Sequence, residues 1–110
     1  MSERKQELLG ELERYYRSCG WKVERATDGT VRAAGPGGVT WIGMAVVPDD
    51  LAADDFDAQL IDLSQQWMPK GALCPLELLP AAECAEELRT TLARLRLADR
   101  GNVSVYSLAA

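Results

Sequence analysis

The side chains that could do chemistry in this chain are concentrated in one acidic segment. Residues 48–69 contain six aspartates and neither lysine nor arginine, whereas the net charge of the whole chain is −5. Carboxylate oxygens suit hard cations such as Mg²⁺ or Ca²⁺, but the segment lacks the glycine turn and the closing glutamate of a calcium loop. We therefore interpret the aspartates as helix caps and as a solvated face that a protein partner could contact. The residues of this predicted acidic patch are Asp49, Asp50, Asp54, Asp55 and Asp57.

The common catalytic side-chain sets are missing. Histidine is absent from the chain, which excludes serine–histidine and cysteine–histidine nucleophiles, the zinc-binding His-Glu-x-x-His helix and the usual general base near neutral pH. The cysteines, at positions 19, 74 and 84, are far apart and form no Cys-x-x-Cys pair. An odd number of dispersed cysteines fits a reduced, cytoplasmic setting. We predict no catalytic residue, no metal ligand and no cofactor.

Charge and hydropathy also limit the class of partner. Overall acidity disfavours a protein that binds the phosphate backbone of nucleic acids, because such binding depends on clustered lysine and arginine. No apolar run approaches the ~20 residues of a membrane span. By contrast, Trp67 and Met68 stand at the end of a predicted helix beside Pro69, where large apolar side chains can stay exposed. Such side chains are typical of the centres of protein interfaces, but the sequence favours packing in the core for them.

These residues must be positioned by a small domain whose central element is the stretch 39–47, Val-Thr-Trp-Ile-Gly-Met-Ala-Val-Val. It carries no charge, and both sets of alternate residues are mostly apolar, which predicts a strand that is buried on both faces. Its Thr, Ile, Val and Trp content favours a strand over a buried helix, as do the Gly-Pro-Gly-Gly before it and the proline after it.

Periodicity and turn signals predict the other elements. Asp28-Gly29 predicts a tight hairpin between two antiparallel strands. The strands that flank the helix after Pro48 are expected to be parallel. In chain order, the predicted elements are a helix from Ser2 to Cys19, strands at 21–25, 30–34 and 39–47, a helix between Asp50 and Trp67, a strand at 73–79, a helix that begins at Pro80 and ends before Gly101, and a strand at 103–108.

This order, αβββαβαβ, predicts a single α/β (α+β) domain over residues 1–110, with a mixed five-stranded sheet and three helices. A chain of this length can form one core without disulfides or metal. Helices on both faces of the sheet, or a dimer partner on one face, would explain the two-sided burial of the central strand.

The order of helix, three-stranded meander, helix, strand, helix and strand resembles the restriction-endonuclease-like (PD-(D/E)xK) nuclease core. Residues 20–25, Gly-Trp-Lys-Val-Glu-Arg, look like its first strand. That family carries an Asp near the second strand and Glu-x-Lys on the third, which together bind a divalent metal. Here Asp28 precedes the second strand, and the third strand offers Trp-Ile-Gly at 41–43. The resemblance therefore implies a nuclease-like fold that lacks the catalytic centre of the family.

A looser similarity is to the small acidic chaperones of type III secretion, which are dimeric α/β proteins that begin with a helix and three strands. This chain departs from them in ending with a strand after its last long helix.

Our leading hypothesis is a cytoplasmic, non-enzymatic protein-interaction module that acts as a homodimer. It would use the acidic patch together with Trp67 and Met68. The alternative is a degenerate or divergent metal-dependent nuclease-like domain, whose migrated centre would be built from Lys22, Glu24 and Asp28.

Overall fold

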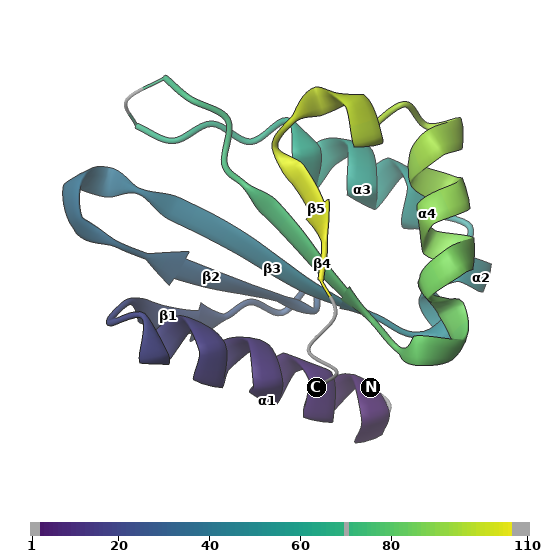
Figure 1. Ribbon diagram of the computed structural model, residues 1–110, viewed down its shortest axis with the longest axis horizontal. Helices are drawn as coiled ribbons and strands as arrows, with labels where there is room; N and C mark the ends of the chain where they lie inside the picture. Colours follow the sequence, from purple (N-terminus) through teal and green to yellow (C-terminus); the bar gives the residue numbers. More distant parts are fainter. Residues whose placement is uncertain (1–2, 70, 107–110) are drawn as a thin grey trace.

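Helices and strands are combined in a computed structural model that describes residues 3–69 and 71–106 (Figure 1). In chain order the elements are α1 (Glu3–Ser18), β1 (Lys22–Arg25), β2 (Thr30–Ala34), β3 (Thr40–Val46), α2 (Pro48–Ala52), α3 (Phe56–Ser64), β4 (Leu76–Pro80), α4 (Ala85–Arg94) and β5 (Val103–Val105). The strands form one five-stranded sheet in the order β1-β2-β3-β4-β5. β2 is antiparallel to β1 and β3, whereas β4 and β5 continue parallel to β3. The predicted fold class and the central position of the 39–47 strand are therefore confirmed.

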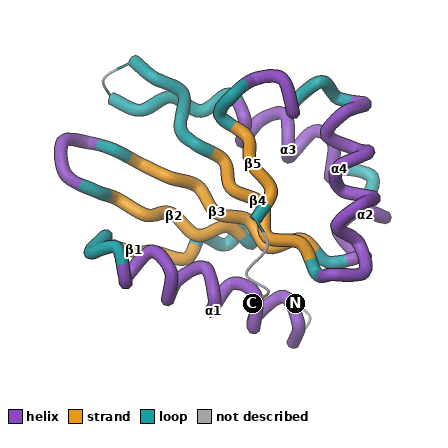
Figure 2. The backbone as a smooth tube through the Cα atoms, viewed as in Figure 1, coloured by secondary structure: helices purple, strands orange, loops and turns teal. Residues whose placement is uncertain are grey.

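Helices cover both faces of the sheet, but not to the same extent. α1 lies alone on one face, whereas α3 and α4 lie together on the other, towards β4 and β5 (Figure 2). β3 sits between these two layers, and its side chains from Ile42 to Val46 are buried. The two-sided apolar pattern of the central strand therefore has its explanation within one chain.

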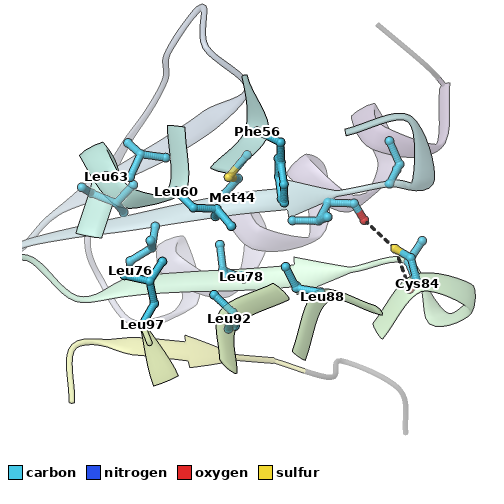
Figure 3. Packing of buried hydrophobic residues seen from close by; sticks show 14 of the residues in the cluster. Met44, Phe56, Leu60, Leu63, Leu76, Leu78, Cys84, Leu88, Leu92 and Leu97 are labelled. Carbon is cyan, nitrogen blue, oxygen red and sulfur yellow. Dashed lines mark hydrogen bonds between the residues drawn. The ribbon is translucent and has the colours of Figure 1, made fainter. Parts of the chain in front are cut away.

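The larger core lies between the sheet and helices α3 and α4 (Figure 3). Ile42 and Met44 of β3 and Leu76 and Leu78 of β4 alternate with residues that point to the other face, and all four are fully buried. The buried side chains that α3 and α4 contribute are Phe56, Leu60, Leu63, Leu88 and Leu92. The smaller core lies between the sheet and α1. Its buried members are Leu9, Leu12, Tyr16, Val31, Ala33, Ala45 and Leu79.

The single helix predicted after Pro48 is in fact two helices. Ala53 is extended (φ −76°, ψ 138°) and separates α2 from α3. α2 has its own cap, because the Asp50 carboxylate accepts a hydrogen bond from the Val47 N–H (2.9 Å). The two aspartates that follow Ala53 favour turns over helix interiors. The break lets the chain change direction before Phe56 enters the core.

Other predicted helix and strand boundaries also differ from the observed ones. Trp67 lies beyond the end of α3 rather than inside a helix. Pro80 ends β4 instead of opening the next helix. The ladder continues past it, because the Ala81 N–H donates to the Val46 carbonyl (2.8 Å). A short 3₁₀ turn then precedes α4. The predicted cap at residue 2 and the predicted strand residues 107 and 108 lie outside the described residues.

Candidate functional site: an open half of the sheet beside Trp67

Part of one sheet face has no helix over it in the described chain. α3 reaches the end of this face at the β1–β2 turn, where Gln59 Nε2 donates to the Asp28 carbonyl (3.1 Å) and Thr30 is fully buried. On the side opposite α1, helices α3 and α4 pack over β3 and β4. Over β1 and β2 this side carries Lys22, Glu24, Arg32 and Ala34, because their neighbours Val23, Val31 and Ala33 point towards α1. Lys22, Glu24 and Ala34 are exposed, and Arg32 is half-buried. We call these four residues the open half-face.

A hydrogen-bonded pair of segments, 66–69 and 71–74, lies beside the open half-face and presents Trp67. Trp67 forms an antiparallel bridge with Leu73, and the Cys74 N–H donates to the Gln66 carbonyl (2.8 Å). Its side chains also hold it to the sheet. Arg32 Nη1 donates to Gln66 Oε1 (2.8 Å), and a β3 backbone N–H donates to the Met68 sulfur (3.3 Å).

Trp67 is 65% exposed, the largest exposure among the large hydrophobic side chains of the described residues. Its neighbours Gln66 and Met68 both reach towards the sheet, so the alternation of an extended segment points the indole ring to solvent. The structure therefore places Trp67 on the surface and only half-buries Met68. Core packing, which the sequence favours for this pair, is therefore wrong for Trp67.

The structure does not bring the acidic patch and Trp67 together. The patch follows the C-terminal end of β3, whereas Met68 contacts Thr40 at the other end of that strand. A strand of seven residues spans roughly 20 Å. The predicted single surface that combined the aspartates with Trp67 and Met68 is thus two separate regions.

Some of the aspartates are also used within the chain. Asp50 caps α2 and forms an ion pair with Lys5 Nζ (2.7 Å). Asp57 pairs with Arg94 at the start of α3 (2.9 Å). Asp49, Asp54 and Asp55 are exposed. The capping interpretation of the segment therefore holds for Asp50, and three members of the patch remain available at the surface.

The residues of the nuclease-like alternative are only partly assembled. Lys22 and Glu24 are exposed on the same face of β1. Asp28 lies in the β1–β2 turn, where its Oδ1 accepts hydrogen bonds from both the N–H (3.1 Å) and the hydroxyl (2.5 Å) of Thr30. Within residues 3–69 and 71–106, no group of three Asp, Glu, Cys or His side chains could hold a metal ion. The nuclease-like centre stays a prediction from the resemblance.

Sequence reasoning missed Glu77, the one acidic side chain that is buried among residues 3–69 and 71–106. Glu77 of β4 is 4% exposed and faces α1. Tyr16 Oη of α1 donates to its Oε1 (2.7 Å), and Tyr106 Oη, just after β5, donates to its Oε2. Burial raises the pKa of the Glu77 carboxyl, and the hydrogen bonds from Tyr106 and Tyr16 lower it by less. Burial, reinforced by the bond to Glu77, raises the pKa of both phenols.

These hydrogen bonds connect α1, β4 and the residue that follows β5. Gly43, the register partner of Glu77 on β3, makes room for it: a Cβ there would lie 2.9 Å from Tyr16 Oη. Both carboxylate oxygens already have donors, so a substrate would have to displace a phenol to reach them. A lone Glu in the apolar run Leu-Glu-Leu-Leu at 76–79 is the sequence signal that could have revealed the site.

Compared with protein-family models, with curated proteins and with solved structures, the chain gave no match. No helix in the described part of the chain has both the length and the apolar character needed to cross a membrane.

Proposed function

We propose that this protein is a non-enzymatic interaction module that binds a partner protein through Trp67 and the adjoining open half-face. The observation that carries the proposal is the 65% exposure of Trp67 on a segment that backbone and side-chain hydrogen bonds hold in place. Tryptophan is among the residues that contribute most to binding when an interface buries them. A backbone that hydrogen bonds already hold loses little conformational freedom on binding, which favours affinity.

The surroundings of Trp67 have the composition of an interface. Lys22, Glu24 and Arg32 supply charges of both signs, and Ala34, the register partner of Lys22, is a small exposed residue beside them. Interfaces commonly combine an apolar centre with a polar rim. The mixed charge favours a protein partner over nucleic acid, since the phosphate backbone calls for clustered positive charge.

The test is affinity capture from cells that express the tagged protein, with wild type compared with two matched variants. Trp67→Ala removes the ring from an exposed site, where little stability is at stake. The control, Asp54→Asn with Asp55→Asn, neutralises two exposed members of the acidic patch. We expect a stoichiometric protein that wild type and the control both retain and that Trp67→Ala loses by at least about tenfold, or roughly 1.4 kcal/mol.

Two outcomes would contradict the proposal. If Trp67→Ala retains the partner and the aspartate variant loses it, the acidic patch is the binding surface instead. If the bound material is nucleic acid that survives moderate salt, the nuclease-like alternative regains support. Thermal unfolding of each variant checks that a loss of binding is not a loss of fold.

A further inference from the structure

The outer edge of β1 carries hydrogen-bonding groups that no strand of the described chain uses. β1 is the terminal strand of the sheet. The Ala26 N–H donates to the Thr30 carbonyl (2.9 Å). Every second residue of an antiparallel strand directs its backbone N–H and C=O at the same neighbouring strand, so Lys22 and Glu24, like Ala26, direct theirs at β2. Because these groups alternate along an antiparallel strand, the N–H and C=O of Val23 point outwards. Val23 therefore offers both a donor and an acceptor to an incoming strand.

The side chains of β1 are complementary to a second copy of themselves in one register only. Two copies that pair antiparallel about a twofold axis at Val23 place Lys22 of each copy opposite Glu24 of the other. An axis at Lys22 or at Glu24 would instead place like charges opposite each other. Facing pairs of opposite charge favour strand pairing, and facing like charges oppose it.

Lys22 and Glu24 are available to pair with a second copy across the contact between two β1 strands, which we call the seam. Within the described residues, no ion pair engages Lys22 or Glu24. Arg25, which points to the opposite face, is instead bound by Glu13 and Gln6 of α1. Charges on an edge strand normally discourage pairing between sheets. Two opposite charges spaced two residues apart exclude most registers but favour the one centred on Val23.

We propose that two copies of this chain associate through antiparallel pairing of β1, with a twofold axis at Val23. Val23 of each copy exchanges two backbone hydrogen bonds with the other, and the two sheets become one. Directly opposed residues of an antiparallel pair lie on the same face, so the two open half-faces join into a single surface flanked by two copies of Trp67. This inference goes beyond the proposed function, because it depends on β1 and not on Trp67.

The test is sedimentation equilibrium of the full chain over a range of micromolar concentrations. Wild type is expected to move from the monomer mass of 12.0 kDa towards twice that value. Lys22→Glu or Glu24→Lys, each alone, puts two like-charged pairs at the seam. We expect either change to raise the dissociation constant by about tenfold or more. Mixing the two variants in equal amounts restores opposite charges at both pairs and should restore association as a heterodimer.

A second variant tests the backbone part of the seam. Val23→Pro removes the outward N–H but none of the hydrogen bonds to β2, and we expect it to abolish association while the circular dichroism spectrum is retained. A wild-type mass that stays monomeric throughout would overturn the proposal. A dimer that neither charge reversal weakens would overturn it too, by placing the contact elsewhere. Capture of a partner by Trp67 is a separate readout, so the two proposals can fail independently.

Discussion

The two faces of the sheet are held to their helices by different physical means. Towards α3 and α4, the core is a continuous aliphatic cluster with a single phenylalanine. Towards α1 it is smaller and more aromatic, and it encloses a carboxylate that receives two phenol hydrogen bonds. The first face gains stability from buried area, which has little directional preference. The second face adds contacts that are satisfied only when α1, β4 and Tyr106 are each in place.

The α1 face depends on small residues as much as on large ones. Gly43 and Ala45 of β3 and Ala33 of β2 let α1 approach the sheet closely enough for Tyr16 to reach Glu77. The face towards α3 and α4 thus tolerates variation in side-chain shape, whereas on the other face a few atoms fix the position of α1. Substitutions on the two faces should therefore differ in kind as well as in size.

The largest effect is expected on the aliphatic face. Leu60→Ala in α3 removes a fully buried side chain and leaves a cavity, at a cost of about 2–5 kcal/mol in the free energy of unfolding. Denaturant titration measures this loss. The titratable members of this cluster are the thiols of Cys74 and Cys84. Burial raises the pKa of both thiols, so they stay protonated over this range and the loss should be equal at pH 5 and pH 8. A loss below about 1 kcal/mol would show that the side chains between the sheet and helices α3 and α4 repack to fill the cavity.

A smaller loss is expected from an added methyl group on the α1 face. The Cβ of Gly43→Ala would meet Tyr16 at 2.9–3.0 Å and Leu12 at 3.4 Å, and overpacking of this kind costs about 1–3 kcal/mol. The matched control is Gly10→Ala inside α1, where the new Cβ meets only Arg25, at 3.8 Å. There we expect a gain of roughly 0.5–1 kcal/mol from helix propensity. Equal effects of the two substitutions in denaturant titrations would contradict a tight α1 contact.

The smallest effect, about 1 kcal/mol, is expected from Tyr106→Phe, which removes one donor to Glu77. Because burial raises the pKa of Glu77 in the folded state, the folded protein keeps this proton to a higher pH than the unfolded chain. The contribution of Glu77 to stability is therefore greatest below the unfolded pKa of about 4.3 and falls as the pH rises towards the folded value. Losing the phenol raises the Glu77 pKa further, so the variant should lose more stability at pH 8 than at pH 4.

The control for this pH dependence is Glu77→Gln, which cannot titrate. Its free energy of unfolding, measured from pH 4 to pH 8, should lack the decline that Glu77 contributes to the wild type. Identical pH profiles for the wild type and Glu77→Gln would show that Glu77 has the same pKa in both states, and the distinction between the faces would reduce to shape alone.

Local patterns predicted much of this fold because they report on local structure. The strand at 30–34 was placed with its observed bounds, and the 39–47 strand proved to be the centre of the sheet. The helix after Pro48 was drawn as one because its apolar spacing continues across the break at Ala53. Hydrophobic periodicity does not reveal a break between two helices when the apolar spacing continues across it.

The sites were harder to predict because they join residues that are distant in the chain. Glu77 meets Tyr16 and Tyr106 across separations of 61 and 29 residues, and no local pattern encodes such contacts. The sequence favoured core packing for Trp67, and its place beside a helix end and a proline offered exposure only as the second interpretation. Its separation from the acidic patch could not be predicted, because the two lie at opposite ends of β3 and only the three-dimensional path of the chain shows this.

The strand order bears on how the chain assembles during synthesis. Each strand pairs with the strand made just before it. The first two pairings close short loops, residues 26–29 and 35–39, whereas the parallel pairings of β4 and β5 need the longer crossovers 47–75 and 81–102. Short loops form quickly. We expect β1 to β3 to pair on the ribosome while the rest of the chain is still being made. The hydrogen bond from Tyr106 to Glu77 needs the residue that follows β5, so the α1 side reaches its final arrangement only after β5 has been made.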